Sequence, residues 1–330
     1  MTTFSNYALE WEETAITNIG LDFGVLNNRL NGTIEVYDKK TDGILYRPTL
    51  PESLNQFTSP LQNLAGVNNK GLEITLGWND RVGDISYSVS GNFTYNKNKV
   101  TKYKGELVRE WRTDANGNKV WYQNVGTVAN GSSNLIVEGH EMNEYYMMNP
   151  YKGNGSYFNS DGTVNINGGP KDGMIRTEAD MKWLQAMFDA GYKFYPNQAI
   201  GKDKIWYGDM IYADYNGDGI YGNDDDRDFQ GVSWRPKYYF GLQASMTWKG
   251  FDLSMNWAGA AGFKIDYYKQ TQNSVSVTHG YGLGYDIAYD HYFFDPENPN
   301  DPRTNIYSET PRLVGYQNSG QASATSSWHL

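Results

Sequence analysis

The stretch KYYFGLQASMTWKGFDLSMNWAGAAG, residues 237–262, decides the fold that we expect for the chain. It contains two runs of alternating apolar and polar residues, separated by Lys249-Gly250. Successive side chains of a strand point to opposite faces, so the pattern predicts a β-hairpin with one apolar and one polar face. Such a hairpin, with aromatic residues near both ends of its apolar runs, is typical of a barrel wall between lipid and water, although sandwich edges can look alike. The apolar positions are Phe240, Leu242, Ala244, Met246, Trp248, Phe251, Leu253, Met255 and Trp257.

The same pattern recurs in two earlier stretches, so we expect hairpins at about residues 16–38, 70–97 and 237–263. Asn27-Asn28 marks the first turn, because Asn tolerates a positive φ. The turns are short and the remaining segments are long, which is the loop asymmetry of outer-membrane barrels with long extracellular loops. We therefore predict extracellular loops at about residues 39–69, 98–236 and 264–330, within one partial barrel domain that spans residues 1–330.

Composition agrees with a two-sided sheet and long polar loops. Aromatic residues make up 15% of the 330 residues, with 27 Tyr and 36 Gly, while the hydrophobic fraction is only 39%. The absence of Cys excludes disulfides and thiolate metal sites. A net charge of −10 without a basic run argues against a nucleic-acid partner. No stretch reaches the about 18 apolar residues of a membrane helix, and the start of the chain has no pattern of a signal peptide.

One short helix is predicted inside the longest loop, from Thr177 to Ala190. Thr177 is a suitable N-cap with Asp180 three residues later, and Gly191 suits the position after the helix. One face would carry Met181, Leu184, Met187 and Phe188 and pack against the floor of the loop. We also predict a strand between Leu135 and Met147 that leads to a barrel rim.

An Asp-rich segment at residues 214–225 matches the twelve-residue calcium-loop template. The calcium ligands would be Asp214, Asn216, Asp218, Ile220 and Asp225. Position 12 is Asp rather than Glu and no flanking helices are visible, so a turn cluster held by its own side-chain hydrogen bonds stays open as the alternative. If calcium binds, its role is structural, because it would neutralise the crowded carboxylates and stiffen the loop.

Aromatic residues in the predicted loops are the candidate substrate-binding residues. Ring faces beside hydrogen-bonding groups suit sugars and also peptides, whereas the alternative is that long loops use these rings as their own core. The candidates are Trp111, Trp121, Tyr122, Tyr145 and Tyr146.

The sequence does not support catalysis. The four His residues show no metal-binding spacing, no nucleophile or phosphate-binding motif stands in a suitable context, and no pair of carboxylates is singled out. We therefore expect a protein that is not an enzyme.

Four stretches together resemble the SusC/RagA group of TonB-linked, or TonB-dependent, outer-membrane transporters. These are residues 11–46, 68–100, 208–231 and 238–262, and their order and spacing also agree with that group. Residues 101–207 and 264–330 match poorly, as specificity loops would.

The resemblance implies an all-β fold: part of an antiparallel transmembrane barrel of about 22 strands, of which the six predicted strands would form one piece. It implies TonB-driven import of oligosaccharides or other large nutrients across the outer membrane of a Gram-negative, Bacteroidetes-like cell. The implied partners are a SusD-like surface lipoprotein, outer-membrane lipid, a glycan or peptide substrate, and the TonB–ExbB–ExbD complex. The plug, the TonB box and the signal peptide of that group are not found in this sequence, so we expect a C-terminal-half barrel fragment.

Two other classes of function stay open from the residues alone: a secreted β-rich carbohydrate-binding or adhesin module, and a secreted glycoside hydrolase. The apolar face discriminates the first of these, because a sandwich buries that face between two sheets, whereas a barrel exposes it to lipid. A hydrolase would need one carboxylate pair on which activity depends.

Overall fold

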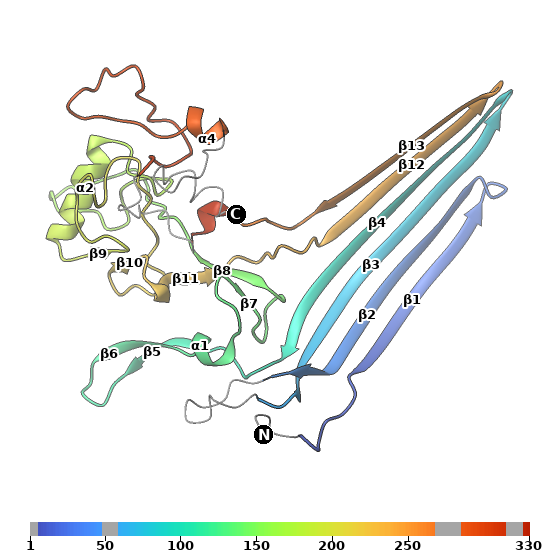
Figure 1. Cartoon of the computed structure of the whole chain (residues 1–330), viewed down its shortest axis with the longest axis horizontal. Helices are drawn as coiled ribbons and strands as arrows, with labels where there is room; N and C mark the ends of the chain where they lie inside the picture. Colours follow the sequence, from blue (N-terminus) through green and yellow to red (C-terminus); the bar gives the residue numbers. More distant parts are fainter. Residues whose placement is uncertain (1–5, 48–58, 268–284, 315–325) are drawn as a thin grey trace. The chain divides into compact units, whose positions relative to one another are not determined.

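The computed structural model describes residues 6–47, 59–267, 285–314 and 326–330 (Figure 1). The chain divides into two compact units. The sheet unit comprises Met1–Glu110, Tyr122–Tyr145 and Gly231–Lys264, and the insertion unit comprises Trp111–Trp121, Tyr146–Gln230 and Ile265–Leu330. No helix in the described part of the chain is long and apolar enough to cross a membrane.

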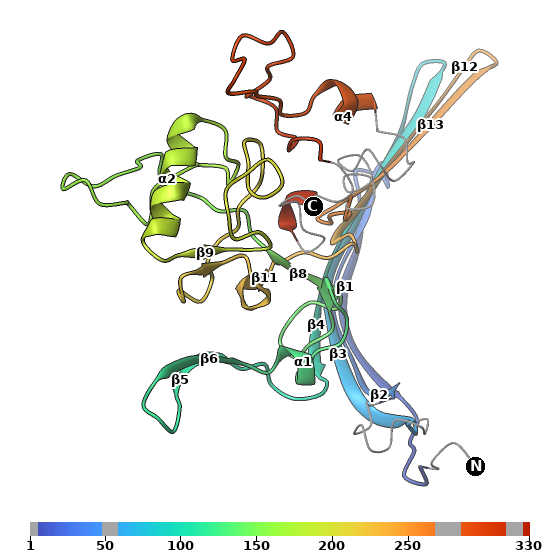
Figure 2. The same cartoon turned by 60° about the vertical axis from the view of Figure 1, so that its left-hand side comes forward.

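Six long antiparallel strands form the sheet unit (Figure 1). Turned by 60°, the sheet is seen close to edge-on and is curved (Figure 2). It does not close on itself, so β1 and β13 are its two edges in the described structure. In spatial order the strands are β1 (Glu13–Val25), β2 (Leu30–Tyr46), β3 (Gln62–Val82), β4 (Ile85–Lys102), β12 (Tyr238–Trp248) and β13 (Phe251–Ala261).

Three short turns join these strands at one end of the sheet. Asn27 and Asn28 have φ of 56° and 60°, and the turn after β12 has Lys249 and Gly250 at 47° and 88°. Turns with positive φ match the right-handed twist of the strands they connect, which explains why Asn and Gly stand there. The other end of the sheet carries the long connections.

β4 pairs directly with β12, although more than a hundred residues separate them in sequence. The register runs without interruption from Tyr238↔Tyr95 to Trp248↔Ile85. The described residues between these two strands therefore add no strand to the six-stranded sheet.

The strands extend further than the alternating pattern indicates, and the predicted loop boundaries are wrong there. β2 continues to Tyr46 and β3 begins at Gln62, inside the predicted loop 39–69, and β4 enters the predicted loop 98–236 as far as Lys102. Backbone pairing continues past the apolar rows, where polar residues occupy both faces for several positions. Beyond them lies a small buried cluster that contains Ala65 and Val100, with Ile44 packed against it. A register shift after Thr41 coincides with Gly43 at a φ of 68°.

Outside this sheet the elements are short. The predicted strand between Leu135 and Met147 is wrong: β7 (Asn134–Leu135) and β8 (Glu144–Met148) are separate strands, and Asn143 with a φ of 60° lies between them. β8 pairs with β7 and with β11 (Arg227–Phe229). The other elements are β5 (Arg109–Thr113), β6 (Lys119–Gln123), α1 (Val125–Val128), β9 (Lys193–Phe194), β10 (Ile220–Tyr221), η2 (Asp224–Asp226), α4 (Tyr285–Tyr289) and η3 (Ser327–His329).

The predicted helix is confirmed as α2 (Glu178–Asp189). Thr177 caps it through a capping box with Asp180, in which each side chain accepts the backbone N–H of the other residue. Gly191, at a φ of 93°, follows the C-terminus. The buried face of the helix packs into the main core of the insertion unit, whose largest fully buried side chain is Trp183.

Candidate functional site: a two-faced sheet and an aromatic cavity

The register of the sheet brings apolar residues of different strands into common rows. Residues directly opposite each other in paired strands share a face. One row consists of Leu21, Ile34, Ile74, Phe93, Phe240 and Gly259. The next consists of Phe23, Gly32, Leu76, Gly91, Leu242 and Trp257. The apolar residues predicted from alternation therefore form one continuous face across all six strands.

This apolar face is exposed. Leu242 is 43% exposed and Leu253 is 49% exposed. A sandwich would bury both side chains against a second sheet. In the described part of the chain they remain uncovered, as the wall of a membrane barrel requires.

The dimensions of the face fit a membrane. β12 carries apolar-face residues from Tyr238 to Trp248, which is about 33 Å along the strand. At the usual strand tilt of about 40° this corresponds to roughly 25 Å along the membrane normal, the height of the apolar band of outer-membrane barrels. Aromatic rings stand at both ends: Tyr95 stacks on Tyr238 with ring centroids 5.1 Å apart, and Trp248 on Phe251 at 6.3 Å.

The opposite face of the sheet is polar and internally hydrogen-bonded. Ser88 and Ser245 share a hydrogen bond of 2.7 Å between their hydroxyls. Thr247 donates to Asp252 at 2.7 Å, and Thr33 donates to Asp22 at 2.6 Å. Such a surface is suited to water, and therefore to the lumen of a barrel.

In the insertion unit, the Asp-rich segment is folded as a set of side-chain-capped turns. Asp214 accepts the backbone N–H groups of Gly217 at 2.7 Å and Gly219 at 2.8 Å through its two carboxylate oxygens. Asp218 accepts the N–H of Ile220 at 2.7 Å. These bonds are those of the turn-cluster alternative. In the described part of the chain, no group of three or more His, Cys, Asp or Glu side chains is placed to hold a metal ion.

Calcium binding by Asp214, Asn216, Asp218, Ile220 and Asp225 therefore stays a prediction. Asp226, which is outside that predicted set, is the buried carboxylate of the segment, at 1% exposure. It accepts backbone N–H groups from Tyr215 at 2.8 Å, Gly222 at 2.8 Å and Asn223 at 3.0 Å. Burial raises the pKa of Asp226 to about 7, although these donors lower it.

The predicted substrate-binding aromatics fall into two sets. Tyr145 and Tyr146 are buried, and Tyr146 packs against Phe229 with ring centroids 4.9 Å apart. These two side chains form part of the protein interior, as the self-packing alternative predicts.

Trp111 and Tyr122 are exposed, whereas Trp121 is half-buried. Trp111 meets Trp121 edge-on at 5.7 Å and donates its indole N–H to the carbonyl of Asn216 at 2.9 Å. Contact of these three residues with a substrate stays a prediction.

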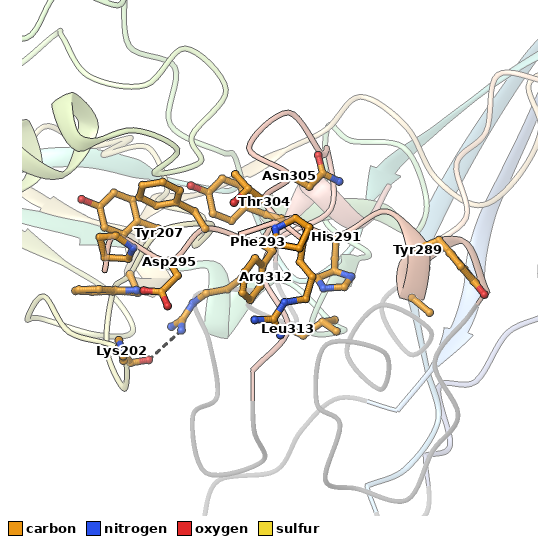
Figure 3. Close-up of a pocket in the computed structure, with 17 residues that line it drawn as sticks. Lys202, Tyr207, Tyr289, His291, Phe293, Asp295, Thr304, Asn305, Arg312 and Leu313 are labelled. Carbon is orange, nitrogen blue, oxygen red and sulfur yellow. Dashed lines mark hydrogen bonds between the residues drawn. The ribbon is translucent and has the colours of Figure 1, made fainter. Parts of the chain in front are cut away.

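A cavity that sequence reasoning missed lies within the insertion unit (Figure 3). Its volume is about 940 Å³. Aromatic rings and hydrogen-bonding groups line it together, which is the usual character of a ligand-binding site. The lining includes Lys202, Trp206, Tyr207, His291, Phe293, Phe294, Asp295, Asn305 and Arg312.

Arg312 fixes one wall of this cavity. Its guanidinium forms two hydrogen bonds of 2.8 Å to the buried carboxylate of Asp209. It also donates to the carbonyl of Lys202 at 2.9 Å, drawn as a dashed line in Figure 3. Most of the donors of Arg312 are thus engaged by protein partners, and Arg312 holds residues 202–209 against the chain more than a hundred residues later.

A second part of the lining is a loop closed by the pairing of Phe293 with Asn305. Arg303 lies over the ring of Phe293 at 4.5 Å and pairs with Asp301 at 2.8 Å. Phe294 packs edge-on against Tyr207 with centroids 5.1 Å apart. The sequence signal for this part of the lining was the aromatic cluster HYFF at residues 291–294 before a Pro- and Asp-rich turn, in a segment assigned only to a loop.

Comparison with known proteins identifies the family. Residues 1–169, about half of the chain, match the family described as TonB dependent receptor-like, beta-barrel. The chain belongs to this family. The predicted resemblance to SusC/RagA transporters and the predicted barrel fold are confirmed.

Two curated relatives of this TonB-dependent receptor chain illustrate the match. The chain is 35% identical over 133 residues to the TonB-dependent receptor SusC of Bacteroides thetaiotaomicron. The aligned region covers 38% of this chain and 13% of that protein. The chain is 30% identical over 170 residues to the TonB-dependent receptor P39 of Formosa agariphila. The aligned region covers 47% of this chain and 16% of that protein. The chain thus spans a minor part of the length of both.

Solved structures show the same fold. The structure of the RagAB peptide transporter aligns with 94% of this chain and 27% of its own, at a TM-score of 0.57 and 17% identity. The RagAB peptide importer in its open-open state aligns with 96% of this chain and 27% of its own, at a TM-score of 0.56 and 18% identity.

A charge on the apolar face should damage membrane insertion far more than a charge on the polar face. Leu242→Arg, in the natural full-length protein, is expected to cost roughly 2–4 kcal/mol of folding free energy in lipid, because a charge at mid-membrane is poorly solvated. Gln243→Arg, one residue away, should cost much less since its side chain stays hydrated. Folding into vesicles followed by gel mobility measures both, and equal losses would contradict the assignment of faces.

The Asp-rich segment should respond to pH through Asp226. Its folded pKa of about 7 lies above the ordinary value, so the stability it contributes is complete in acid and is lost as the pH rises through 7. Unfolding free energy of the insertion unit should therefore fall from about pH 4 to above pH 7. Asp226→Asn should flatten that profile and Asp224→Asn, with an exposed side chain, should not. A profile that Asp226→Asn leaves unchanged would refute this role.

A calcium titration distinguishes a calcium-binding loop from a cluster of side-chain-capped turns at residues 214–225. If the loop binds calcium, the ion should raise the unfolding temperature of the wild-type protein, and Asp214→Ala and Asp218→Ala should each abolish the increase, because each removes a ligand. The measurement is thermal unfolding with and without added calcium. An absence of any calcium-dependent change in the wild type would leave the turn cluster as the account of these residues.

Proposed function

We propose that this chain contributes part of the wall and a ligand-contacting extracellular insertion to an outer-membrane importer of oligosaccharides or other large nutrients, including peptides. The observation that carries the proposal is the continuous exposed apolar face, backed by a continuous polar face across six strands, in a chain of the TonB-dependent receptor family. A wall of this kind has a use only where lipid lies on one side and water on the other.

The energy source and the lipoprotein partner are inferred from the relatives. Import would be driven by the TonB–ExbB–ExbD complex, and a SusD-like lipoprotein of the outer membrane would act with the barrel. Similarity to a receptor named SusC and to the RagAB peptide transporter supports both inferences.

The aromatic cavity is the part of the insertion best suited to contact the imported compound. Trp206 and Phe294 provide ring faces, while Lys202, Asp295 and Asn305 provide charged and amide groups beside them. Aromatic rings can pack against the apolar faces of a sugar ring or a peptide, and the neighbouring polar groups can hydrogen-bond its hydroxyl or amide groups.

Deletion of the natural gene should abolish growth on one class of oligosaccharide or peptide, and loss of TonB should have the same effect. In the complemented strain, Trp206→Ala should weaken binding of that compound by roughly tenfold, because it removes a ring from the cavity. The matched control is Trp234→Ala, which removes an exposed Trp outside the cavity lining. Growth of the deletion strain on every such compound would contradict import, whereas an unaffected affinity of the Trp206 variant would contradict only the cavity.

A further inference from the structure

Just beyond the apolar rows, the same face of the sheet becomes strongly basic. The first row past the aromatic residues Tyr95 and Tyr238 contains Thr17, Asp38, Lys70 and Lys97. The second contains Ala15, Lys40, Asn68 and Lys99. We call Lys40, Lys70, Lys97 and Lys99 the lysine belt. All four are exposed.

The belt carries a surplus of positive charge that the sheet does not neutralise. Asp38 is the acidic residue of these two rows, and it pairs with Lys70 at 3.2 Å. Lys97 lies directly opposite Lys70 on the next strand, and like charges in that position destabilise a sheet. Glu13 and Asp42 face each other one row farther out, on β1 and β2 rather than on β4, where Lys97 and Lys99 lie.

The two ends of the apolar face differ in this respect. At the turn end, basic residues alternate with acidic ones: Arg29 pairs with Asp80 at 3.2 Å and Lys249 with Asp84 at 3.6 Å, while Arg81 donates to the carbonyl of Gly83 at 3.1 Å. The basic surplus is therefore a property of the end that carries the long connections.

The belt also lies at the depth of lipid headgroups. Successive rows on one face are about 7 Å apart along a strand, so the two rows lie roughly 5–10 Å above the last apolar row once the strand tilt is included. The polar zone of a bilayer extends about 5–8 Å beyond the hydrocarbon on each side. The first row lies within this zone, and the second row, with Lys40 and Lys99, lies just beyond it. The long side chains of the second row can extend back along the sheet and place their ammonium groups in this zone.

We propose that the lysine belt binds the phosphate groups of a phosphorylated glycolipid in the membrane leaflet at the end of the long connections. The acyl chains of that lipid would cover the apolar rows below, while its phosphates would neutralise Lys97 and Lys99 on β4 and Lys40 on β2. Charge complementarity and continuity with the exposed apolar face both support this occupant over a protein partner. The proposal goes beyond import, and no transport step enters it.

The test uses the natural full-length protein in nanodiscs of phosphatidylcholine that contain either diphosphoryl lipid A or the same lipid A without phosphates. Native mass spectrometry would measure the lipid bound. The wild type should retain the phosphorylated form at least tenfold better, because several lysines each contribute to binding an anionic lipid. Equal retention of both forms by the wild type would overturn the proposal, whatever happens to any variant.

A charge-matched pair of variants locates the site. Lys40→Gln with Lys99→Gln removes two belt lysines from one row and should weaken retention by roughly tenfold. Lys39→Gln with Lys249→Gln removes the same charge from the opposite face and from the turn end, and should leave retention nearly unchanged. Equal losses in both pairs would refute the belt as the site. Displacement of the lipid by inorganic phosphate alone would show binding of free phosphate rather than of a lipid, and would also refute the proposal.

Discussion

The whole account depends on a single hydrogen-bonded register that runs across six strands. Because side chains alternate between faces, a slip of one residue in any pair would move every apolar side chain of a strand to the polar face. The pairing from Leu21↔Ile34 to Phe240↔Gly259 prevents this, since it keeps six strands in phase. Packing on the apolar face reinforces the register: a Cβ added at Gly32 would lie 2.8 Å from both Phe23 and Leu76, whose side chains fill that place.

The insertion unit has a hydrophobic core of its own, so its sequence can change without affecting the register of the sheet. Trp183, Phe194 and Ile211 are fully buried within the insertion unit, and Tyr292 reaches them from the C-terminal segment of the chain. The connection leaves the sheet after β4 and returns to the neighbouring strand β12, so its sequence can change without altering the pairing of the wall. If the cavity binds the imported compound as proposed, its lining can change with that compound while the membrane-facing rows stay the same.

Sequence patterns predicted those features that depend on local periodicity. The three hairpins follow from alternation of period two, the first turn follows from Asn27-Asn28, and α2 follows from Thr177, Asp180 and the spacing of Met181, Leu184 and Met187. The end of β2 and the start of β3 could not be predicted in this way, because the alternation stops at the polar residues 38–41 and 68–70 and the register shifts beyond Thr41. The cavity depends on contacts between distant segments, such as Asp209 with Arg312, which no local pattern encodes. The spacing of Asp214, Asn216 and Asp218 suits both a cation loop and Asx turns, so the sequence alone could not decide between them.

The central claim is that Leu253 faces lipid while its neighbour Ser254 faces water. Single cysteines can be introduced at these two positions, in a region that contains no Cys of its own, and labelled in the native membrane of a natural protein from which any other accessible Cys has been removed. The account predicts that a fluorophore at 253 is quenched by a lipid-soluble quencher and is shielded from a water-soluble one, and that a fluorophore at 254 shows the reverse. If both labels are quenched from water alone, or if both are shielded from lipid, the two-faced wall described above is wrong.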